Sequence, residues 1–251
     1  MESFQGKAIT VDFEELSYRE TPFGELILRR RTEVSLGVEV YEVKLGDEFL
    51  MSSLFTGSEI ALAQLALEKL AAPSADVVVG GLGLGYTAKA VLANERVRSL
   101  LVVEALKDVI DWHRTALVPL GVELTSDPRC RFVNADFFAL VDSEDLDSTS
   151  PGRRFDAILV DIDHSPRHLL HPQHAMLYKR EGLVRVARHK RPNGVFGLWS
   201  NDPPDVDFQA ELDHVFGVSD ACVVKFPNPL LGKEAACTVY IATTLVEATT
   251  R

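Results

Sequence analysis

The sequence predicts a doubly wound α/β domain behind a small N-terminal antiparallel β appendage. Short, wholly apolar runs alternate with helical stretches from residue 76 onward, and a glycine-rich segment directly follows the first run. Residues before 57 instead show period-two patterning interrupted by Pro and Gly. Parallel strands buried on both faces form continuous apolar runs, whereas half-exposed antiparallel strands alternate apolar and polar residues.

The appendage is expected over residues 1–56. Thr21-Pro22-Phe23-Gly24 separates a strand at 16–20 from one that begins at 25, and Leu45-Gly46-Asp47 separates strands at 38–43 and 48–51. A short turn with Pro or Gly between two strands is the signature of a β-hairpin. We therefore expect two hairpins.

The α/β domain is expected over residues 57–251. Ser58 is a candidate helix cap, because apolar residues follow at helical spacing from Ile60 to Leu70. Alternating strands and helices then predict a mainly parallel sheet that ends in two adjacent strands. The expected strands are 77–79, 100–103, 131–133, 157–160, 195–199, 221–226 and 237–243, and the expected helices are 87–93, 107–117, 175–189 and 208–215.

Composition excludes several classes of protein. The 251 residues are 46% hydrophobic and 25% charged, typical of a soluble globular chain, and the net charge of -11 disfavours binding to nucleic acid or an anionic membrane. No apolar run reaches the length of a membrane span, and no signal peptide is recognisable. Cys130, Cys222 and Cys237 are too widely spaced for a metal motif or a disulfide framework, so we expect a cytoplasmic protein.

The strongest indication of function is Gly80-Gly81-Leu82-Gly83-Leu84-Gly85, between an apolar strand and a helix. Glycines in this context let the backbone adopt positive φ and approach a ligand closely. A tight strand–helix turn without a ligand is the weaker explanation. We expect Gly81, Gly83 and Gly85 to contact a nucleoside-type ligand.

Two further strand ends point to the same edge of the sheet. Glu104 ends the second apolar strand about 20 residues after the loop, where an acidic residue accepts hydrogen bonds from ribose hydroxyls. An ordinary solvated glutamate is the alternative. Asp136 follows the third strand and is suited to an adenine amine, with Phe137 supporting the ring; a helix-capping role explains Asp136 equally well.

These motifs resemble, in type and order, those of spermidine synthase-like proteins in the class I S-adenosylmethionine-dependent methyltransferase superfamily. The alternating glycines fit that superfamily better than the nicotinamide fingerprint, which needs a third glycine three residues after the second. The resemblance covers most of the chain and implies a seven-stranded Rossmann-like methyltransferase sheet, an S-adenosyl-type donor, a small-molecule acceptor and a homodimer. The segments that carry it are Gly80–Gly85, Val102–Glu104, Asp127–Arg129, Asn134–Asp136, Phe155–Asp161, Tyr178, Gly182-Leu183 and Arg191–Gly194.

The chain departs from the family's pattern in its polar residues. The aspartate of the family's Gly-Gly-Gly-Asp-Gly loop falls on Gly83, and only Glu59 matches the Tyr-His-Glu run of the first helix. Glu59 is therefore a candidate substrate-binding residue. The family's Asp-Ser-Ser-Asp-Pro segment corresponds to Asp161-Ile162-Asp163-His164-Ser165-Pro166, in which one acidic residue matches clearly.

Gly83 bears on the choice of donor. A carboxylate there would attract the propylamine of decarboxylated S-adenosylmethionine and repel the carboxylate of S-adenosylmethionine itself. Its replacement favours S-adenosylmethionine, and hence transfer of a methyl or related alkyl group to a small amine or acid. A polyamine aminopropyltransferase that uses the decarboxylated donor is the alternative, and a non-catalytic nucleoside-binding protein is a second one.

The segment after the fourth apolar strand holds the candidate catalytic residues Asp161, Asp163 and His164, since carboxylates and histidines act as general bases. Metal binding by the histidines is a weaker interpretation, because Pro166 and Pro172 interrupt any helix that would align them. We expect no metal. The remaining histidines are better explained as solvated loop residues; they are His168, His171 and His174.

The end of the fifth strand offers two more acceptor-binding candidates. Trp199 and Asp202 are placed to line an acceptor pocket at the carboxyl edge of the sheet. A buried tryptophan and a loop start before Pro203-Pro204 are the simpler explanation.

Overall fold

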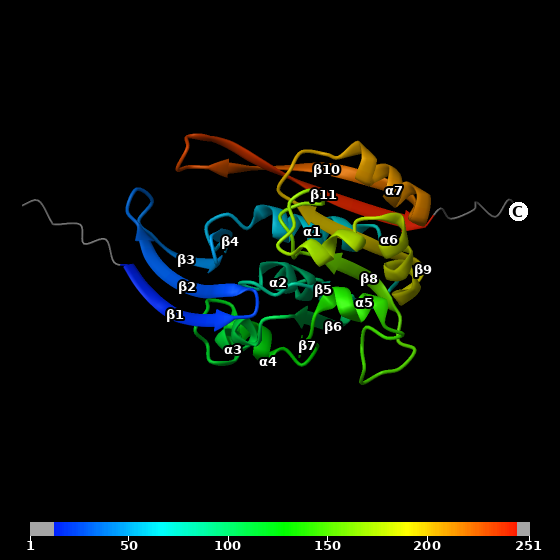
Figure 1. Ribbon diagram of the computed structural model, residues 1–251, viewed down its shortest axis with the longest axis horizontal. Coiled ribbons are helices and arrows are strands. Elements are labelled where there is room, and N and C mark those ends of the chain that lie inside the picture. The colour runs from blue at the N-terminus through cyan, green and yellow to red at the C-terminus, as the bar shows by residue number, and fades with distance from the viewer. Residues whose placement is uncertain (1–12, 245–251) are drawn as a thin grey trace, which may run out of the picture. The chain divides into compact units, whose positions relative to one another are not determined.

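Two separate sheets are present in the computed structural model, which describes residues 13–244 (Figure 1). The chain divides into one unit at Met1–Phe55 and a second at Thr56–Arg251. No helix in the described part of the chain is long and apolar enough to cross a membrane.

The first unit is a four-stranded antiparallel sheet in sequential order, so the two predicted hairpins form a continuous meander. Gly24 and Gly46 occupy its turns with φ of 119° and 56°, a conformation that residues with a Cβ rarely adopt. Its core contains Leu26, Leu28 and Val40. The strands are β1 (Phe13–Thr21), β2 (Gly24–Glu33), β3 (Val38–Leu45) and β4 (Glu48–Ser52).

The second unit contains the predicted seven-stranded sheet, with strand order β10-β11-β9-β8-β5-β6-β7. The five strands from β9 to β7 are parallel, and β11 and β10 add antiparallel at one edge. Every residue of the central strands β5 and β8 is buried, as the apolar runs at 77–79 and 157–160 predict for most of their length. The strands are β5 (Ala75–Gly80), β6 (Val97–Glu104), β7 (Cys130–Asn134), β8 (Phe155–Val160), β9 (Lys190–Ser200), β10 (Gly217–Asn228) and β11 (Lys233–Thr244).

Helices cover both faces of this sheet, which confirms the doubly wound α/β fold. On one face, α6 packs against α5 and α7 over Ile158, Val160 and Leu198. On the other face, α1 packs against α2, and Leu62 meets Leu159 above Gly197. The helices are α1 (Gly57–Glu68), α2 (Tyr86–Leu92), α3 (Lys107–Arg114), α4 (Gly121–Ser126), α5 (Phe137–Asp142), α6 (Arg180–His189) and α7 (Val206–Phe216).

Two local predictions were wrong. Ser58 does not cap α1: Thr56 occupies the N-cap, and the Ser58 hydroxyl bonds the neighbouring Glu59 carboxylate instead. The helix predicted at 175–189 is broken into a 3₁₀ turn, Pro172–Met176, and α6. Lys179 between them is extended, with φ of -103° and ψ of 162°, so the chain turns sharply before α6 begins.

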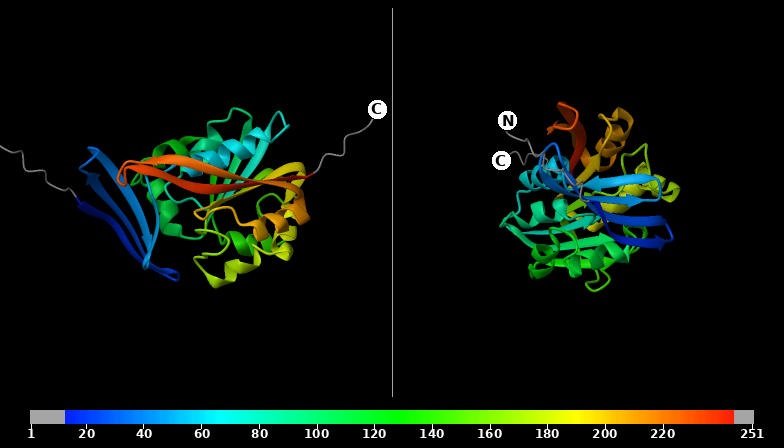
Figure 2. Two further views of the ribbon diagram at one scale, coloured as in Figure 1. Left: turned by 90° about the horizontal axis from the view of Figure 1, so that it is seen from above. Right: turned by 90° about the vertical axis from the view of Figure 1, so that its left-hand side faces the viewer.

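The β10–β11 hairpin extends beyond β9, the strand with which it pairs in the sheet (Figure 2). Its strands pair continuously from Gly217↔Thr244 to Asn228↔Lys233. Only Thr238–Thr243 of β11 pair with β9, so the distal half of the hairpin extends beyond that strand. Cys237 lies at the point where the hairpin leaves β9, beside the carboxyl edge of the sheet.

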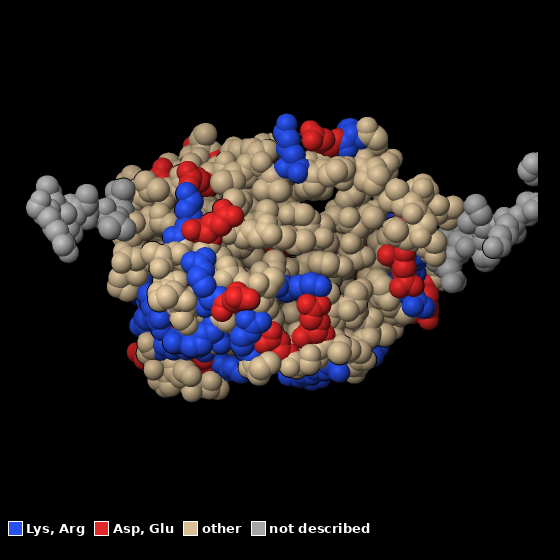
Figure 3. All heavy atoms as spheres, turned by 180° about the vertical axis from the view of Figure 1, so that it is seen from behind, with Lys and Arg blue, Asp and Glu red and all other residues tan. Residues whose placement is uncertain are grey.

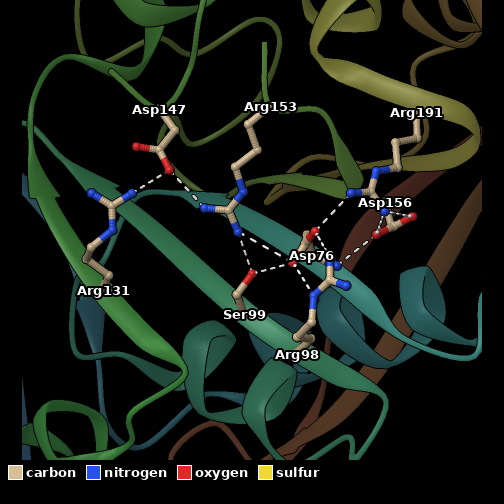
Figure 4. Close-up of polar contacts among 8 residues, drawn as sticks. All are labelled: Asp76, Arg98, Ser99, Arg131, Asp147, Arg153, Asp156 and Arg191. Atoms are coloured by element: carbon tan, nitrogen blue, oxygen red, sulfur yellow. Dashed lines mark hydrogen bonds and ion pairs between the residues drawn. The ribbon is translucent and has the colours of Figure 1, made fainter. Parts of the chain in front are cut away.

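An ionic cluster joins the amino ends of the strands, at the edge opposite the glycine loop (Figure 4). The Asp76 carboxylate at the start of β5 receives bonds from Arg98 on β6, Ser99 Oγ at 2.6 Å and Arg191 Nη2 of β9 at 3.0 Å. Arg191 also reaches Asp156 on β8, with Nη1 3.1 Å from Oδ2. Four strands are thus tied together at this end.

A neighbouring part of the cluster ties β7 to the loop before β8. Asp147, whose side chain is 1% exposed, pairs with Arg131 at 2.5 Å and with Arg153 at 2.8 Å. The aspartates lie below the surface while Arg98 and Arg131 remain 58% and 41% exposed. Basic side chains crowd one part of the surface in Figure 3 although the whole chain is acidic.

Candidate active site

The glycine loop has the backbone conformation that its composition predicts. Gly81, Gly83 and Gly85 have φ of 96°, 48° and 92°. A Cβ on Gly81 would lie 2.0 Å from the Asp161 carbonyl oxygen, so only glycine allows β8 to approach this closely. The Asp161 N–H in turn donates to the Gly80 carbonyl at 2.9 Å. The loop and the end of β8 therefore form one rigid cradle.

Glu104 lies beside this cradle at the end of β6. Its carboxylate accepts from the backbone N–H groups of Leu82 and Leu106, each at 2.9 Å. Burial raises the pKa of Glu104, and these backbone hydrogen bonds oppose the rise. The backbone N–H groups of Gly83 and Ala105 also bond this carboxylate, so a ribose diol would share its acceptor positions with the loop amides. Ribose binding by Glu104 remains a prediction.

Asp136 and Phe137 have structural partners. Asp136 caps α5, with its Oδ1 accepting from Phe138 N–H at 2.9 Å. Phe137 is buried beneath the loop, and a Cβ on Gly80 would lie 2.7 Å from its ring. Because its ring is covered, Phe137 supports the loop from below rather than presenting a face to adenine. Phe138 instead stacks on His174, with ring centroids 3.8 Å apart.

Asp161 and Glu59 form the acidic centre of the site. Thr87, in the first turn of α2, donates its hydroxyl to Asp161 Oδ2 at 2.6 Å and lies 3.4 Å from the Glu59 carbonyl oxygen. Burial raises the pKa of Asp161 to about 6, against the lowering effect of the Thr87 bond. Burial and the neighbouring Asp161 charge raise the pKa of Glu59 to about 7. Both groups therefore exchange protons near neutral pH.

One side chain of α1 and one of β11 lie next to the Glu59–Asp161 pair. Ser58 Oγ donates to Glu59 Oε2 at 2.8 Å. Cys237 is buried beside the pair, with Sγ 3.7 Å from Asn201 Oδ1. Burial raises the pKa of the Cys237 thiol, and the charges of Glu59 and Asp161 add to the rise. Cys237 is therefore a neutral thiol at this position.

Asp163 has a different environment from Asp161 although only one residue separates them. Its buried carboxylate accepts from Leu170 N–H at 2.7 Å, His174 Nδ1 at 2.8 Å and Tyr178 OH at 2.7 Å. Burial, and then the Asp163 charge, raise the pKa of Tyr178 well above its usual range. With three donors on its two oxygens, Asp163 orders residues 163–178 and is poorly suited to act as the base.

The other predicted residues are dispersed along the carboxyl edge. The His164 carbonyl oxygen accepts from Asn201 N–H at 2.7 Å, which joins the ends of β8 and β9. His168 Nδ1 lies 3.2 Å from Asp202 Oδ2 at an exposed position. Trp199 is half-buried on β9, where it pairs with Val239 of β11. Within residues 13–244, no three His, Cys, Asp or Glu side chains are grouped as a metal site requires.

The model of the spermine/spermidine synthase domain matches residues 58–206, more than half of the chain. The chain belongs to the spermine/spermidine synthase family. This confirms the family predicted from the glycine loop and the strand-end motifs. No curated protein is significantly similar to the chain in sequence.

Solved structures place this spermine/spermidine synthase family member in the expected fold. A spermidine synthase from Thermotoga maritima is 17% identical, with a TM-score of 0.70 over 93% of this chain and 74% of the other. A spermidine synthase in complex with the transition-state analogue AdoDATO is 16% identical, with a TM-score of 0.71 over 98% and 84%. Human methyltransferase-like protein 13 in complex with SAH is 17% identical, with a TM-score of 0.55 over 77% and 85%.

Two residues that contact the site are not marked by any motif in the sequence of this family member. Thr87 is a polar residue in the first turn of the helix after the glycine loop, but nothing in the sequence indicates that it bonds Asp161. His113 lies in the amphipathic helix α3, and its Nε2 donates to the Gly83 carbonyl at 2.9 Å. His113 is completely buried, which the sequence pattern does not indicate.

Proposed function

We propose that the chain transfers an aminopropyl group from decarboxylated S-adenosylmethionine to a small-molecule amine. The observation that carries this proposal is the carboxyl pair of Glu59 and Asp161 beside the glycine cradle, with Asp161 held by Thr87. Membership of the spermine/spermidine synthase family supports the same reaction class.

The acidic pair suits a cationic acceptor. An amine reaches the site as an ammonium ion, and it must lose a proton before its nitrogen can attack carbon. Asp161, with a pKa of about 6, is ionised at neutral pH and can accept that proton, while its charge attracts the ammonium group. Glu59, with a pKa of about 7, adds negative charge once it is deprotonated.

The cradle fits the nucleoside part of such a donor. Gly81, Gly83 and Gly85 leave room for a ligand because glycine has no side chain, and the Glu104 carboxylate lies at the loop, where the fold places a ribose-binding acidic residue. When bound, the donor would supply an electrophilic carbon next to a sulfonium. The amine nitrogen forms the new C–N bond, the C–S bond breaks with its electron pair going to sulfur, and the displaced proton goes to Asp161.

Methyl transfer from S-adenosylmethionine is the second candidate, and Gly83 is the observation that favours it. At the position of the family's loop aspartate, Gly83 offers no carboxylate for a propylamine and none to repel an amino acid carboxylate. Aminopropyl transfer then requires the Glu59–Asp161 pair to replace the missing charge.

Product analysis separates these possibilities. The chain is incubated with each donor and 1,4-diaminobutane: methylthioadenosine as product supports aminopropyl transfer, and S-adenosylhomocysteine supports methyl transfer. Asp161→Asn should reduce the rate by about a hundredfold or more, whereas Asp207→Asn, whose side chain is 84% exposed, should change it little. Calorimetric binding of both donors without turnover of any amine would overturn both reactions and favour a nucleoside-binding protein.

A further inference from the structure

His113 contacts the glycine loop at two places. Its Nε2 donates to the Gly83 carbonyl at 2.9 Å, and its imidazole packs beneath Gly85, where a Cβ would lie 2.9 Å from Cε1. The imidazole and Phe132 on β7 have ring centroids 5.6 Å apart, and Leu124 of α4 also reaches Gly85, where a Cβ would lie 2.5 Å from its Cδ1. The His113 side chain is fully buried, so the position of α3 is transmitted directly to the loop.

Two side chains thereby hold the loop, one as a hydrogen-bond acceptor and the other as a donor. Glu104 accepts the Leu82 N–H at 2.9 Å, and His113 donates to the carbonyl one residue further on. Gly83 has a φ of 48°, and its peptide can rotate when either bond is lost because glycine has no Cβ to restrict it. A carbonyl left without its donor in this buried position would favour such a rotation.

Only the neutral imidazole fits this position. Nδ1 is buried and has no hydrogen-bond partner among the described residues, so a second proton would have no acceptor there. Burial lowers the pKa of His113, and the Gly83 bond opposes that effect. Charged groups on the surrounding elements are engaged elsewhere: Lys89 of α2 pairs with Glu123 of α4, and Arg131 of β7 pairs with Asp147.

We propose that His113 is a positioning residue, which fixes the glycine loop in its ligand-binding conformation through the Nε2–Gly83 bond and makes adenosyl-ligand affinity depend on the neutral imidazole. The ligand part of this inference rests on the proposed function. The conformational part concerns the free protein and can be tested without any ligand.

The chain offers a matched control in His189. This second buried histidine donates from Nε2 to the Val141 carbonyl at 3.0 Å, and its Nδ1 also has no partner among the described residues. Burial lowers its pKa as well. It joins α6 to the end of α5, and no contact links it to the glycine loop.

The test compares Leu and Gln at both positions by calorimetry with S-adenosylmethionine and methylthioadenosine from about pH 5.5 to 8. His113→Leu removes the donor and should weaken both ligands roughly three- to tenfold, the value of one ordinary hydrogen bond. His113→Gln places an amide N–H near the Nε2 position and should restore affinity. It should also abolish the loss of affinity expected for the wild type when His113 becomes protonated, which begins below pH 6.5 because burial lowers the pKa of His113. His189→Leu and His189→Gln should keep wild-type affinity and pH profile.

Hydrogen exchange in the ligand-free protein separates this inference from the proposed function. His113→Leu should accelerate exchange of the Leu82–Gly85 amides, and His189→Leu should not. If the wild type binds neither ligand but the loop still loosens, the proposed function fails and the positioning role stands. Equal effects of His113→Leu and His189→Leu on exchange and affinity, or a wild-type acid profile in His113→Gln, would overturn the inference.

Discussion

The hydroxyl of Thr87 donates to Asp161 Oδ2 at 2.6 Å, and this bond joins the helix after the glycine loop to the end of β8. Donor cradle and candidate base are thus connected through one side chain. Because the bond favours the ionised carboxylate, Thr87 also affects the pH at which Asp161 can accept a proton.

Replacement of Thr87 by Val should raise the pKa of Asp161 above its present value of about 6, since the hydroxyl that stabilises the charge is lost. The acid limb of the pH–rate profile should therefore move to higher pH. Thr87→Ser keeps the hydroxyl and should retain the wild-type profile. A fall in rate at all pH values without movement of the limb would show that Thr87 only orients the carboxylate.

Glu59 should make the protein less stable as pH rises. Its folded pKa of about 7 exceeds the ordinary 4.5, so the folded state holds the proton more tightly, and stability falls between these two pH values. Glu59→Gln should remove this loss and stabilise the protein at pH 8 by about 1–3 kcal/mol. Urea unfolding at acidic and alkaline pH measures the difference; parallel curves for wild type and variant would contradict the assignment.

Asp163→Asn should destabilise the fold by about 2–4 kcal/mol, because the amide nitrogen of Asn would face donors that now bond a carboxylate. Tyr178→Phe removes only one of the three bonds and should cost about 1 kcal/mol. Chemical denaturation provides both values. A rate loss in Asp163→Asn with unchanged stability would instead restore Asp163 as a catalytic residue.

Asp76→Asn should destabilise the protein without weakening any adenosyl ligand. Burial alone would raise the pKa of Asp76, but bonds from Arg98 and Ser99 outweigh it and lower the pKa. Its contribution is thus present above pH 3.8 and lost as pH falls. The expected loss at neutral pH is about 2–4 kcal/mol, measured by denaturation beside calorimetry of the ligand. Weakened binding would show that the two edges of the sheet are coupled.

The sequence predicted the sheet well because strands buried on both faces are rich in apolar residues: after Asp76 in β5 and Asp156 in β8, every remaining residue of the strand is apolar or glycine. The cradle was predictable because Gly81 and its neighbours are required by backbone geometry. The division of roles between Asp161 and Asp163 was not, since it depends on Leu170, His174 and Tyr178 turning back onto one of two similar carboxylates. The role of Ser58 was not predictable for the same reason: its hydroxyl bonds the Glu59 side chain instead of a backbone N–H group at the start of α1.

The position of the arginine–aspartate cluster has a consequence for how this protein can evolve. The amino ends of β5, β6, β8 and β9 are fastened to one another far from the residues that would meet an acceptor. Exposed Asn201 directly follows β9, so an exchange there falls beside a strand whose register is secured at its other end. If the proposed transfer reaction is correct, single substitutions there would change acceptor preference on an unchanged framework, which suits a family whose members share a fold at low sequence identity.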